Sequence, residues 1–466
     1  MTRLAALPGL AVAAFVVSLS IGCVVGPNYT RPQMPSPPQY RFAEGPSQAQ
    51  TLADAPWFQI FDDTTLQGLI RDAIANNLDL RIAVARVEAA RAQAGISKSF
   101  LYPQVDGVAG YGVRAASTTE ESDDTTHQSG VYGFRLSWEL DLFGRIRRQT
   151  EAATALALAS EQARRGVLVT LVGDVATNYF LLRELDLQLD IARRTLDIND
   201  QTVRYFQDRL DGGVSNRLEL DRIQANRALT AAAIPELENQ VARVENAISL
   251  LLGRAPGPIA RQSLAMGDQL PPQIPPGLPV SLIERRPDVQ EAEQLLVAAN
   301  ANIGVAKSLF FPTISLTGFL GGVSGDLTTF LGGGGAVGSF SAGLLQPVFQ
   351  AGRLRRNLEA VQAQFNAAVA AYQRAALNGY REVADSLVTI QKLAQTRTQR
   401  QVGVVALQDA SDLSRSRYDS GLASYIEILT ADQDLFQQEL LLAQAQGAEL
   451  RARAELYRAL GGGWQQ

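Results

Sequence analysis

Residues 131–153 read VYGFRLSWELDLFGRIRRQTEAA, and the spacing of their apolar side chains changes within this stretch. Apolar and polar residues alternate up to Leu142, which predicts a β-strand with one apolar and one polar face. From Arg145 the chain runs to Leu210 without proline. At 1.5 Å per residue this segment predicts a helix roughly 100 Å long. A compact globular domain does not bury so long a helix.

The same arrangement occurs twice in the chain. Sliding the sequence by 208 residues places Gly144, Arg145, Arg147, Arg148 and Glu151 on Gly352, Arg353, Arg355, Arg356 and Glu359. Upstream of the strand the offset is 209, and it relates Lys98, Ser99 and Pro103 to Lys307, Ser308 and Pro312. An offset that stays nearly constant over so much of the chain indicates one structural unit duplicated in tandem, with a period of about 208 residues.

The duplication divides the chain into two repeats with flanking segments. We expect a lipoprotein signal peptide at 1–22, an extended arm at 23–63, a first repeat at 64–252, a proline-rich linker at 253–285, a second repeat at 286–460 and a tail at 461–466. Each repeat is expected to contain a helix, a β-hairpin and a long helical pair. In the first repeat the helix is predicted at 64–101, the hairpin at 104–142 and the helical pair at 145–252. In the second repeat the helix is predicted to begin at 286, the hairpin to span 313–347 and the helical pair 353–460.

The long helices carry the spacing of a coiled coil. Apolar residues follow a 3-4 rhythm over residues 182–210, with Asn199 filling the one gap, and residues 234–251 repeat the rhythm. Such heptads predict left-handed coiled-coil packing between each long helix and the helix that returns beside it. Gly213 and Gly421 predict the turns at the helix tips, because glycine permits the left-handed backbone that ends a helix.

The predicted strands have the dimensions of membrane-spanning strands. Each hairpin has about ten residues per arm, which is the length needed to cross a bilayer at a tilt. The polar stretch Ser117–Gly130 is expected to be a solvent loop. The side chains expected to face the membrane are Tyr132, Phe134, Leu136 and Trp138.

One chain supplies four such strands, which cannot close a barrel. Open strand edges are not tolerated in lipid, and the smallest outer-membrane barrels use about eight strands. The barrel must therefore be shared between copies, and two, three or four copies would give eight, twelve or sixteen strands. Because each hairpin leads into a helical pair, the pattern predicts a mixed α/β membrane protein with a β-barrel continued by a helical tube.

Composition excludes several classes of function. The formal net charge is −5, which argues against a nucleic-acid partner. Cys23 and His127 are the only cysteine and histidine, so no metal-ligand cluster is expected. No nucleophile–base or carboxylate pair stands out, so we do not expect an enzyme, and no cofactor is expected apart from a covalent lipid.

The N-terminus predicts a secreted lipoprotein. Arg3 precedes an apolar run from Leu4 to Leu19, and the run is interrupted by Pro8. Such a segment is typical of a cleaved secretory signal, and a spanning helix is the alternative. Cys23 follows the small residue Gly22, where bacterial lipoproteins are cut and acylated, so Cys23 is the predicted lipidation site in the outer membrane.

Several motifs resemble those of a known family. They are Val25-Gly26-Pro27-Asn28-Tyr29 with Arg31-Pro32, Trp57 before Phe61-Asp62-Asp63, Glu284-Arg285-Arg286-Pro287-Asp288, and Ser308-Leu309-Phe310-Phe311-Pro312. With these motifs the whole mature chain resembles the TolC-like outer-membrane factors, in the NodT-type lipoprotein branch of efflux channels. From the residues alone, Arg286 and Asp288 are expected to serve a helix start rather than a buried pair.

The resemblance implies a homotrimer with a twelve-stranded outer-membrane barrel and a twelve-helix periplasmic tunnel. It also implies two protein partners, a periplasmic adaptor (membrane fusion protein) and an inner-membrane pump of the resistance-nodulation-division type. The implied function is the outer-membrane channel of a tripartite efflux system for small molecules and drugs. The channel would be lipid-anchored and would extend into the periplasm.

The resemblance also implies a gate at the periplasmic helix tips, where rings of like charge control passage. Glu427 is the expected ring residue, and Ile426, Leu429, Thr430 and Asp432 complete the candidate constriction. Tyr418, Glu219 and Arg417 are the expected gate-stabilising residues, with Tyr418 bonding to the neighbouring pair at Glu219. The alternative is that Glu427 and Glu219 are solvated acids favoured by the helix dipole.

Two other functions stay open at this point. The same channel could export proteins with an ATP-driven pump (type I secretion), because cargo is not encoded in the chain. A periplasmic coiled-coil scaffold without a pore is the third hypothesis. The alternating strand at 131–142 argues against a scaffold, which has no need for lipid-facing Phe134, Leu136 and Trp138.

Overall fold

The computed structural model describes residues 24–43, 63–116, 125–261, 285–325 and 335–462. Its elements in chain order are α3 (Thr64–Asn76), α4 (Leu78–Ser99), β1 (Gln104–Ala116), β2 (Thr125–Leu140), α5 (Arg145–Asp211), α6 (Arg217–Leu251), α8 (Pro287–Ser308), β3 (Thr313–Ser324), β4 (Gly335–Leu345), α10 (Arg353–Asp419) and α11 (Tyr425–Ala459). The predicted signal peptide, Cys23, much of the arm and residues 262–284 of the linker lie outside the described residues.

The chain divides into two compact units. Unit 1 comprises residues 1–33, 86–161 and 291–373, and unit 2 comprises residues 34–85, 162–290 and 374–466. Both units draw on both sequence repeats, so the duplication does not correspond to two separate domains. The helices α5 and α10 each contribute residues to both units.

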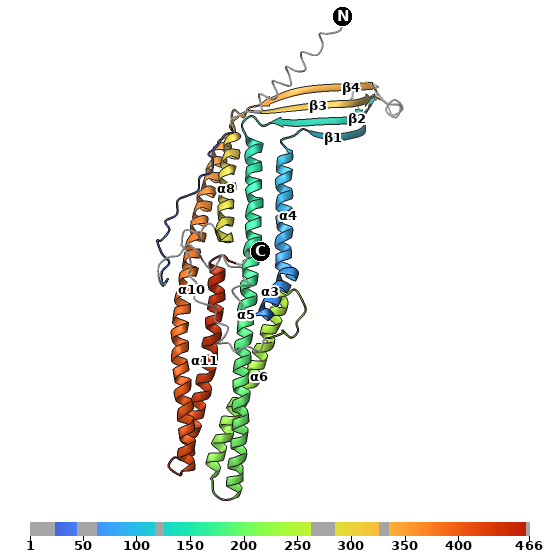
Figure 1. The fold of residues 1–466 in the computed structure, drawn as a ribbon. Helices are drawn as coiled ribbons and strands as arrows, with labels where there is room; N and C mark the ends of the chain where they lie inside the picture. The colour runs from blue at the N-terminus through green and yellow to red at the C-terminus, as the bar shows by residue number, and fades with distance from the viewer. Residues whose placement is uncertain (1–23, 44–62, 117–124, 262–284, 326–334, 463–466) are drawn as a thin grey trace. The chain divides into compact units, whose positions relative to one another are not determined.

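Unit 1 contains one antiparallel sheet with the strand order β1-β2-β3-β4 (Figure 1). The two predicted hairpins are confirmed, and β2 of the first pairs with β3 of the second. The first hairpin is longer than expected, because Ala116 pairs with Thr125 inside the stretch predicted to be a loop. β1 and β4 are the two edges of this sheet, and every residue of β4 is exposed.

Glycines in the sheet accommodate aromatic side chains from the neighbouring strand. Tyr132 on β2 is paired with Gly322 on β3. A Cβ atom added at Gly322 would overlap the Tyr132 ring, so the glycine provides the space in which the ring lies. Trp138, also on the predicted membrane-facing side, donates its indole N–H to the carbonyl of Leu101 at 3.0 Å. These contacts fix two of the predicted membrane-facing side chains within the protomer.

The single helix predicted at 64–101 is interrupted in the structure. α3 ends at Asn76 and α4 begins at Leu78, so Asn77 separates them. The Asn77 side-chain oxygen accepts a hydrogen bond from the Leu80 N–H at 2.9 Å, and its amide donates to the carbonyl of Leu251 at 2.9 Å. Asparagine therefore caps α4 and links it to the end of α6, because its amide competes with the helical backbone for hydrogen bonds.

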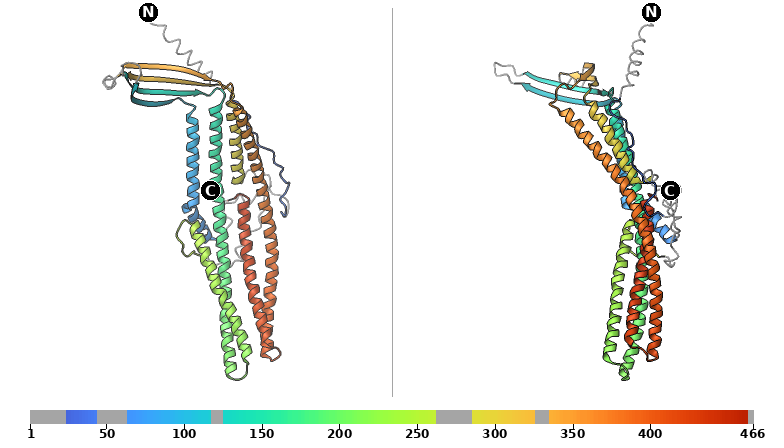
Figure 2. Two further views of the ribbon diagram at one scale, coloured as in Figure 1. Left: turned by 180° about the vertical axis from the view of Figure 1, so that it is seen from behind. Right: turned by 90° about the vertical axis from the view of Figure 1, so that its left-hand side faces the viewer.

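The four long helical segments of unit 2 form two antiparallel pairs. α6 returns alongside α5, and α11 returns alongside α10, in both views of Figure 2. The prediction of a long helix beginning at Arg145 and of its repeat beginning at Arg353 is confirmed, and each helix has 67 residues. The core of unit 2 is built around Tyr179 on α5, which is fully buried and donates its hydroxyl to Asp63 at 2.8 Å. Asp63 in turn caps the N-terminus of α3.

The gap in the heptad pattern at Asn199 is filled by a polar network. Asn199 donates its side-chain amide to the Thr230 hydroxyl at 3.0 Å and accepts from Asn226 at 3.4 Å. Gln433 on α11 donates to Asn226 at 2.9 Å, so the network connects both helical pairs. A satisfied polar residue at a core position fixes the register of a coiled coil, because shifting the helices would leave it unpaired.

The buried guanidinium of Arg286 forms an ion pair with Asp288, whose side chain is nearly half exposed. Its guanidinium binds both oxygens of Asp288 at 2.9 and 2.6 Å and donates to the Ala459 carbonyl at 2.7 Å. Glu382 on α10 lies 2.8 Å away. Pro287 is the first residue of α8, where its missing N–H costs no hydrogen bond. Asp288 is the acidic residue in the first turn of α8, so the expected helix-start role is confirmed for Asp288. Arg286 immediately precedes α8, and its side chain in addition joins three segments of unit 2.

Candidate functional site

Both turns at the free ends of the helical pairs have the predicted glycine geometry. Gly213 and Gly421 have φ angles of 73° and 72°, in the left-handed region. Val214 and Leu422, the next residues, donate their N–H groups to carbonyls five residues earlier, both at 2.9 Å. These are the hydrogen bonds of a Schellman ending, which satisfies carbonyls that the helix leaves unpaired.

The two turns start their returning helices differently, although the repeat relates them. The Asn216 side chain caps α6 by accepting from the Glu219 N–H at 3.0 Å. Its counterpart Ser424 makes no side-chain cap bond at the start of α11. Glu219 also accepts from the Ser215 hydroxyl at 2.7 Å. The carboxylate of Glu219 is therefore occupied locally within its own turn.

An apolar cluster joins the two helical pairs next to the turns. We call it the tip cluster, and it consists of Phe206, Leu220, Ile223, Tyr425, Ile428 and Leu429, with Val203, Leu210 and Tyr418 packed against it. Phe206 is 1% exposed, and its ring lies 4.3 Å from that of Tyr425. All four helices contribute to this cluster, so it couples the position of one pair to that of the other.

Charged side chains surround the tip cluster. Arg417 approaches Glu427 with 3.6 Å between Nε and Oε2, across the turn between α10 and α11. The repeat counterpart of Arg417 is Arg209, which instead lies over the rings of Tyr205 and Tyr418 at 5.5 and 6.0 Å from their centroids. Arg209 also donates to the Tyr205 hydroxyl at 2.9 Å. Arg209 was not predicted as a residue of the candidate site, although the internal repeat, which relates it to Arg417, is a signal that could have identified it.

The predicted constriction residues separate into exposed and enclosed groups. Ile426, Glu427 and Thr430 are exposed on α11, and the Thr430 hydroxyl donates to the Ile426 carbonyl at 2.9 Å. Leu429, by contrast, is buried in the tip cluster, which leaves it little surface with which to line a channel. Leu429 lies four residues after Tyr425 and therefore shares the face of α11 that packs into the tip cluster.

Asp432 is also engaged within the protomer. It accepts hydrogen bonds from the Ser411 hydroxyl at 2.5 Å and from the Arg415 guanidinium at 2.9 and 3.0 Å. These contacts connect α11 to α10. Among the described residues no hydrogen bond joins Tyr418 to Glu219, although the two side chains are near enough to interact electrostatically.

Two tyrosines of the tip cluster, Tyr418 and Tyr425, have raised pKa values. Burial raises the pKa of Tyr425, and the nearby carboxylate of Asp432 adds to this effect. Burial also raises the pKa of Tyr418, and the positive charge of Arg209 opposes the rise. Both phenols therefore keep the hydrogen that they can donate, and neither adds negative charge beside Glu427.

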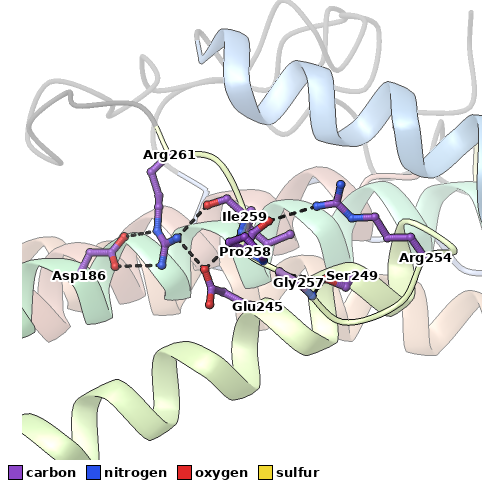
Figure 3. Close-up of polar contacts among 8 residues, drawn as sticks. All are labelled: Asp186, Glu245, Ser249, Arg254, Gly257, Pro258, Ile259 and Arg261. Carbon is purple, nitrogen blue, oxygen red and sulfur yellow. Dashed lines mark hydrogen bonds and ion pairs between the residues drawn. The ribbon is translucent and has the colours of Figure 1, made fainter.

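A polar cluster around Arg261 attaches the start of the linker to α5 and α6 (Figure 3). Arg261 binds Asp186 on α5 at 2.9 Å and Glu245 on α6 at 2.6 Å. The N–H of Ile259 donates to the same Glu245 carboxylate at 3.2 Å, and the Ile259 side chain is buried. Arg261 thereby connects α5, α6 and the linker at one point of unit 2.

The N-terminal motif is bound to the helices of unit 1. Arg31 donates two hydrogen bonds to the Glu293 carboxylate at 2.7 and 2.6 Å, and the Tyr29 hydroxyl donates to it at 3.1 Å. Arg148 on α5 donates to the side chain of Asn28 at 2.9 Å. The segment that follows Cys23 therefore has a fixed position on α5 and α8.

Comparison with known proteins places these features in a family. A family model described as outer membrane efflux protein matches residues 69–254 and 278–462, which lie in the first and second repeats. The cation efflux system protein CusC of Escherichia coli is 35% identical over 456 residues, covering 97% of this chain and 98% of that protein. The probable efflux pump outer membrane protein TtgC of Pseudomonas putida is 36% identical over 470 residues, covering 98% and 95%.

A solved channel has the same fold. The crystal structure of the open state of the MtrE outer membrane channel of Neisseria gonorrhoeae matches with a TM-score of 0.86 and 29% identity, covering 95% of this chain and 99% of that one. The fold is thus shared over nearly the whole chain. This chain therefore belongs to the outer membrane efflux protein family and is an outer-membrane efflux channel protein.

Proposed function

We propose that three copies of this chain form a closed twelve-stranded barrel in the outer membrane. The observation that supports sharing is the four-stranded sheet with two edges, β1 and β4, in a protein of the outer membrane. Unpaired strand edges are too costly in lipid, so β4 of one copy would pair with β1 of the next. The strand count alone also permits two or four copies, and the family resemblance favours three.

The proposed complex includes a periplasmic adaptor and an inner-membrane pump of the resistance-nodulation-division type. Val214 and Leu422, at equivalent places in the two turns, are 65% and 72% exposed. Exposed apolar residues that recur at the free ends of both helical pairs suit contact with a partner protein. We propose that the adaptor binds these turns and that Cys23 carries the lipid that anchors each copy.

The proposed cargo is small molecules. CusC is named for cation efflux, and a TtgC protein of Pseudomonas putida is named as a component of a toluene efflux pump, so both names refer to small species. In this chain the proposed gate is a ring of Glu427 residues with Ile426 and Thr430 beside it on the exposed face of α11. Leu429 and Asp432 are left out because their side chains are engaged within the protomer.

A Glu427→Gln variant tests this gate in planar bilayers. Three carboxylates in a narrow ring favour cations, so removing the charge while keeping the shape is expected to weaken cation selectivity. The reversal potential in a KCl gradient should move toward zero, while channels still form. Glu238→Gln is the matched control, since Glu238 lies on α6 away from the turns, pairs with Arg193 at 2.7 Å, and should leave selectivity unchanged. Equal effects of both substitutions would contradict a gate specific to Glu427.

A further inference from the structure

Lysine is used very selectively in this chain. Of 42 basic residues only three are lysines, namely Lys98, Lys307 and Lys392. Lys98 and Lys307 are related by the 209-residue offset, and each lies in the last turn of a helix, α4 or α8. These two helices are the ones that lead into the strands β1 and β3 of the sheet.

A helix dipole accounts for a positive charge at these positions but not for the choice of lysine. Cations stabilise the last turn of any helix. The last turns of α5, α10 and α11 contain Arg209, Arg417 and Arg458 instead. Lysine differs from arginine in having a compact, strongly hydrated charge on a flexible stem. The helices α4 and α8, which lead into the sheet, therefore share a lysine in the last turn, where α5, α10 and α11 have arginine.

The two ammonium groups are not used inside the protomer. Across the described residues, the side-chain ammonium groups of Lys98 and Lys307 take part in no hydrogen bond or ion pair. Several arginines of the same unit are paired, and Arg145, for example, binds Glu139 at 2.7 Å. Lys98 is exposed and Lys307 is half-buried, so both charges can meet a partner outside the chain.

Exposed aromatic side chains follow both lysines. Phe100 and Tyr102 come directly after α4, and Phe310 and Phe311 come directly after α8; all four are exposed. A lysine followed by aromatic residues at the end of a membrane strand is the composition of a membrane–water interface, where the rings lie at headgroup level. We call these residues the collar: Lys98, Phe100, Tyr102, Lys307, Phe310 and Phe311.

The described segment that follows the proposed lipidation site is bound close to the collar. Phe143 stacks on Phe311 with 4.8 Å between ring centroids. The Phe143 carbonyl accepts a hydrogen bond from the N–H of Val25 at 3.2 Å. Cys23 is two residues before Val25, and consecutive Cα atoms are about 3.8 Å apart, so its acyl chains would enter the membrane beside the collar. The anchor and the collar therefore mark the same membrane surface.

We propose that the collar binds anionic phospholipid headgroups of the periplasmic leaflet, with Lys98 and Lys307 contacting the phosphate groups and the aromatic rings lying among the acyl-chain ends. The proposal builds on the outer-membrane location of the family and does not depend on the gate at Glu427 or on the number of copies. Because the collar is positively charged, we expect it to bind anionic lipids such as phosphatidylglycerol in preference to zwitterionic lipids.

Lysine acetylation of the intact wild-type oligomer tests the proposal. The purified protein is labelled with an acetylating reagent in detergent, in phosphatidylcholine vesicles and in vesicles that also contain phosphatidylglycerol, and labelling is read by mass spectrometry. The labelling rates of Lys98 and Lys307 should fall by about fivefold between the two kinds of vesicle, as expected for about 1 kcal/mol per lysine at an anionic surface. Lys392, which bonds Gln395 on α10, is the internal control and should not change.

Three outcomes would overturn the proposal. Equal protection in both kinds of vesicle would mean that the bilayer excludes the reagent without recognising charge. Slow labelling already in detergent would mean that a neighbouring copy covers the lysines. The third outcome concerns phosphatidylglycerol that co-purifies with the protein, measured by native mass spectrometry. We expect a variant with both Lys98→Gln and Lys307→Gln to lose at least half of this lipid and the Lys392→Gln variant to keep it. An unchanged amount of lipid in the double variant would contradict the proposal.

Discussion

Phe206→Ala is expected to loosen the helix tips and to raise the conductance of the channel. The Phe206 ring is buried at the centre of the tip cluster, where it contacts Tyr425 on the other helical pair. Truncating a buried phenylalanine typically costs about 3–5 kcal/mol, because packing is lost and a cavity remains. Here the loss falls on the contacts that couple α5 and α6 to α10 and α11, so the two pairs should separate more readily.

Hydrogen exchange and bilayer recordings together check this expectation. Amides in residues 200–225 and 415–435 should exchange faster in the variant, and unitary currents should become larger. Leu218→Ala is the matched control, because Leu218 on α6 is 63% exposed and its loss should change stability by about 0.5 kcal/mol or less. Faster exchange without larger currents would contradict this prediction, because it would show that loosening the tip cluster does not open the channel.

Arg286→Ala is expected to destabilise unit 2 more than any substitution on its outer surface. The Arg286 side chain is 9% exposed and binds Asp288, Glu382 and the carbonyl of Ala459. Removing one partner of a buried ion pair costs about 3–5 kcal/mol, and the lower end applies here because both carboxylates are nearly half exposed. The variant should also leave the Ala459 carbonyl without its donor.

The measurement is the unfolding temperature of the detergent-solubilised protein, with Arg381→Ala as control. Arg381 is the residue before Glu382 on α10, but it is exposed and pairs with Asp385 on the surface. Surface pairs contribute about 0–1 kcal/mol, so the control should unfold near the wild-type temperature. Similar unfolding temperatures for both variants would show that the guanidinium of Arg286 does not stabilise unit 2.

The features that could be predicted from the sequence are those that depend on local periodicity. Alternation over residues 131–142 and the proline-free segment after Arg145 identified β2 and α5, and the internal repeat then supplied their counterparts. The break between α3 and α4 could not be predicted, because the capping role of Asn77 depends in part on the Leu251 carbonyl, 174 residues away. Asn199 was recognised as a gap, but its partners on α6 become visible only in the fold.

The candidate site shows the same limit. The glycines of both turns were predictable, because a left-handed residue at a helix end is a local requirement. Which side chains of α11 face outward was not, since the rotation of that helix is set by the packing of Tyr425, Ile428 and Leu429 around Phe206. Sequence resemblance therefore offered Leu429 as a channel-lining residue, and the burial of its side chain removes it from the proposed gate.

The most direct test of the shared barrel is the mass of the complex extracted from the outer membrane, measured by native mass spectrometry. A sheet with two edges per chain requires other copies to close it in lipid, and we expect the mass of three mature lipidated chains. A complex of a single chain would contradict the shared barrel, because four strands cannot enclose a channel. A folded complex of two or four chains would keep a shared barrel and contradict the trimer.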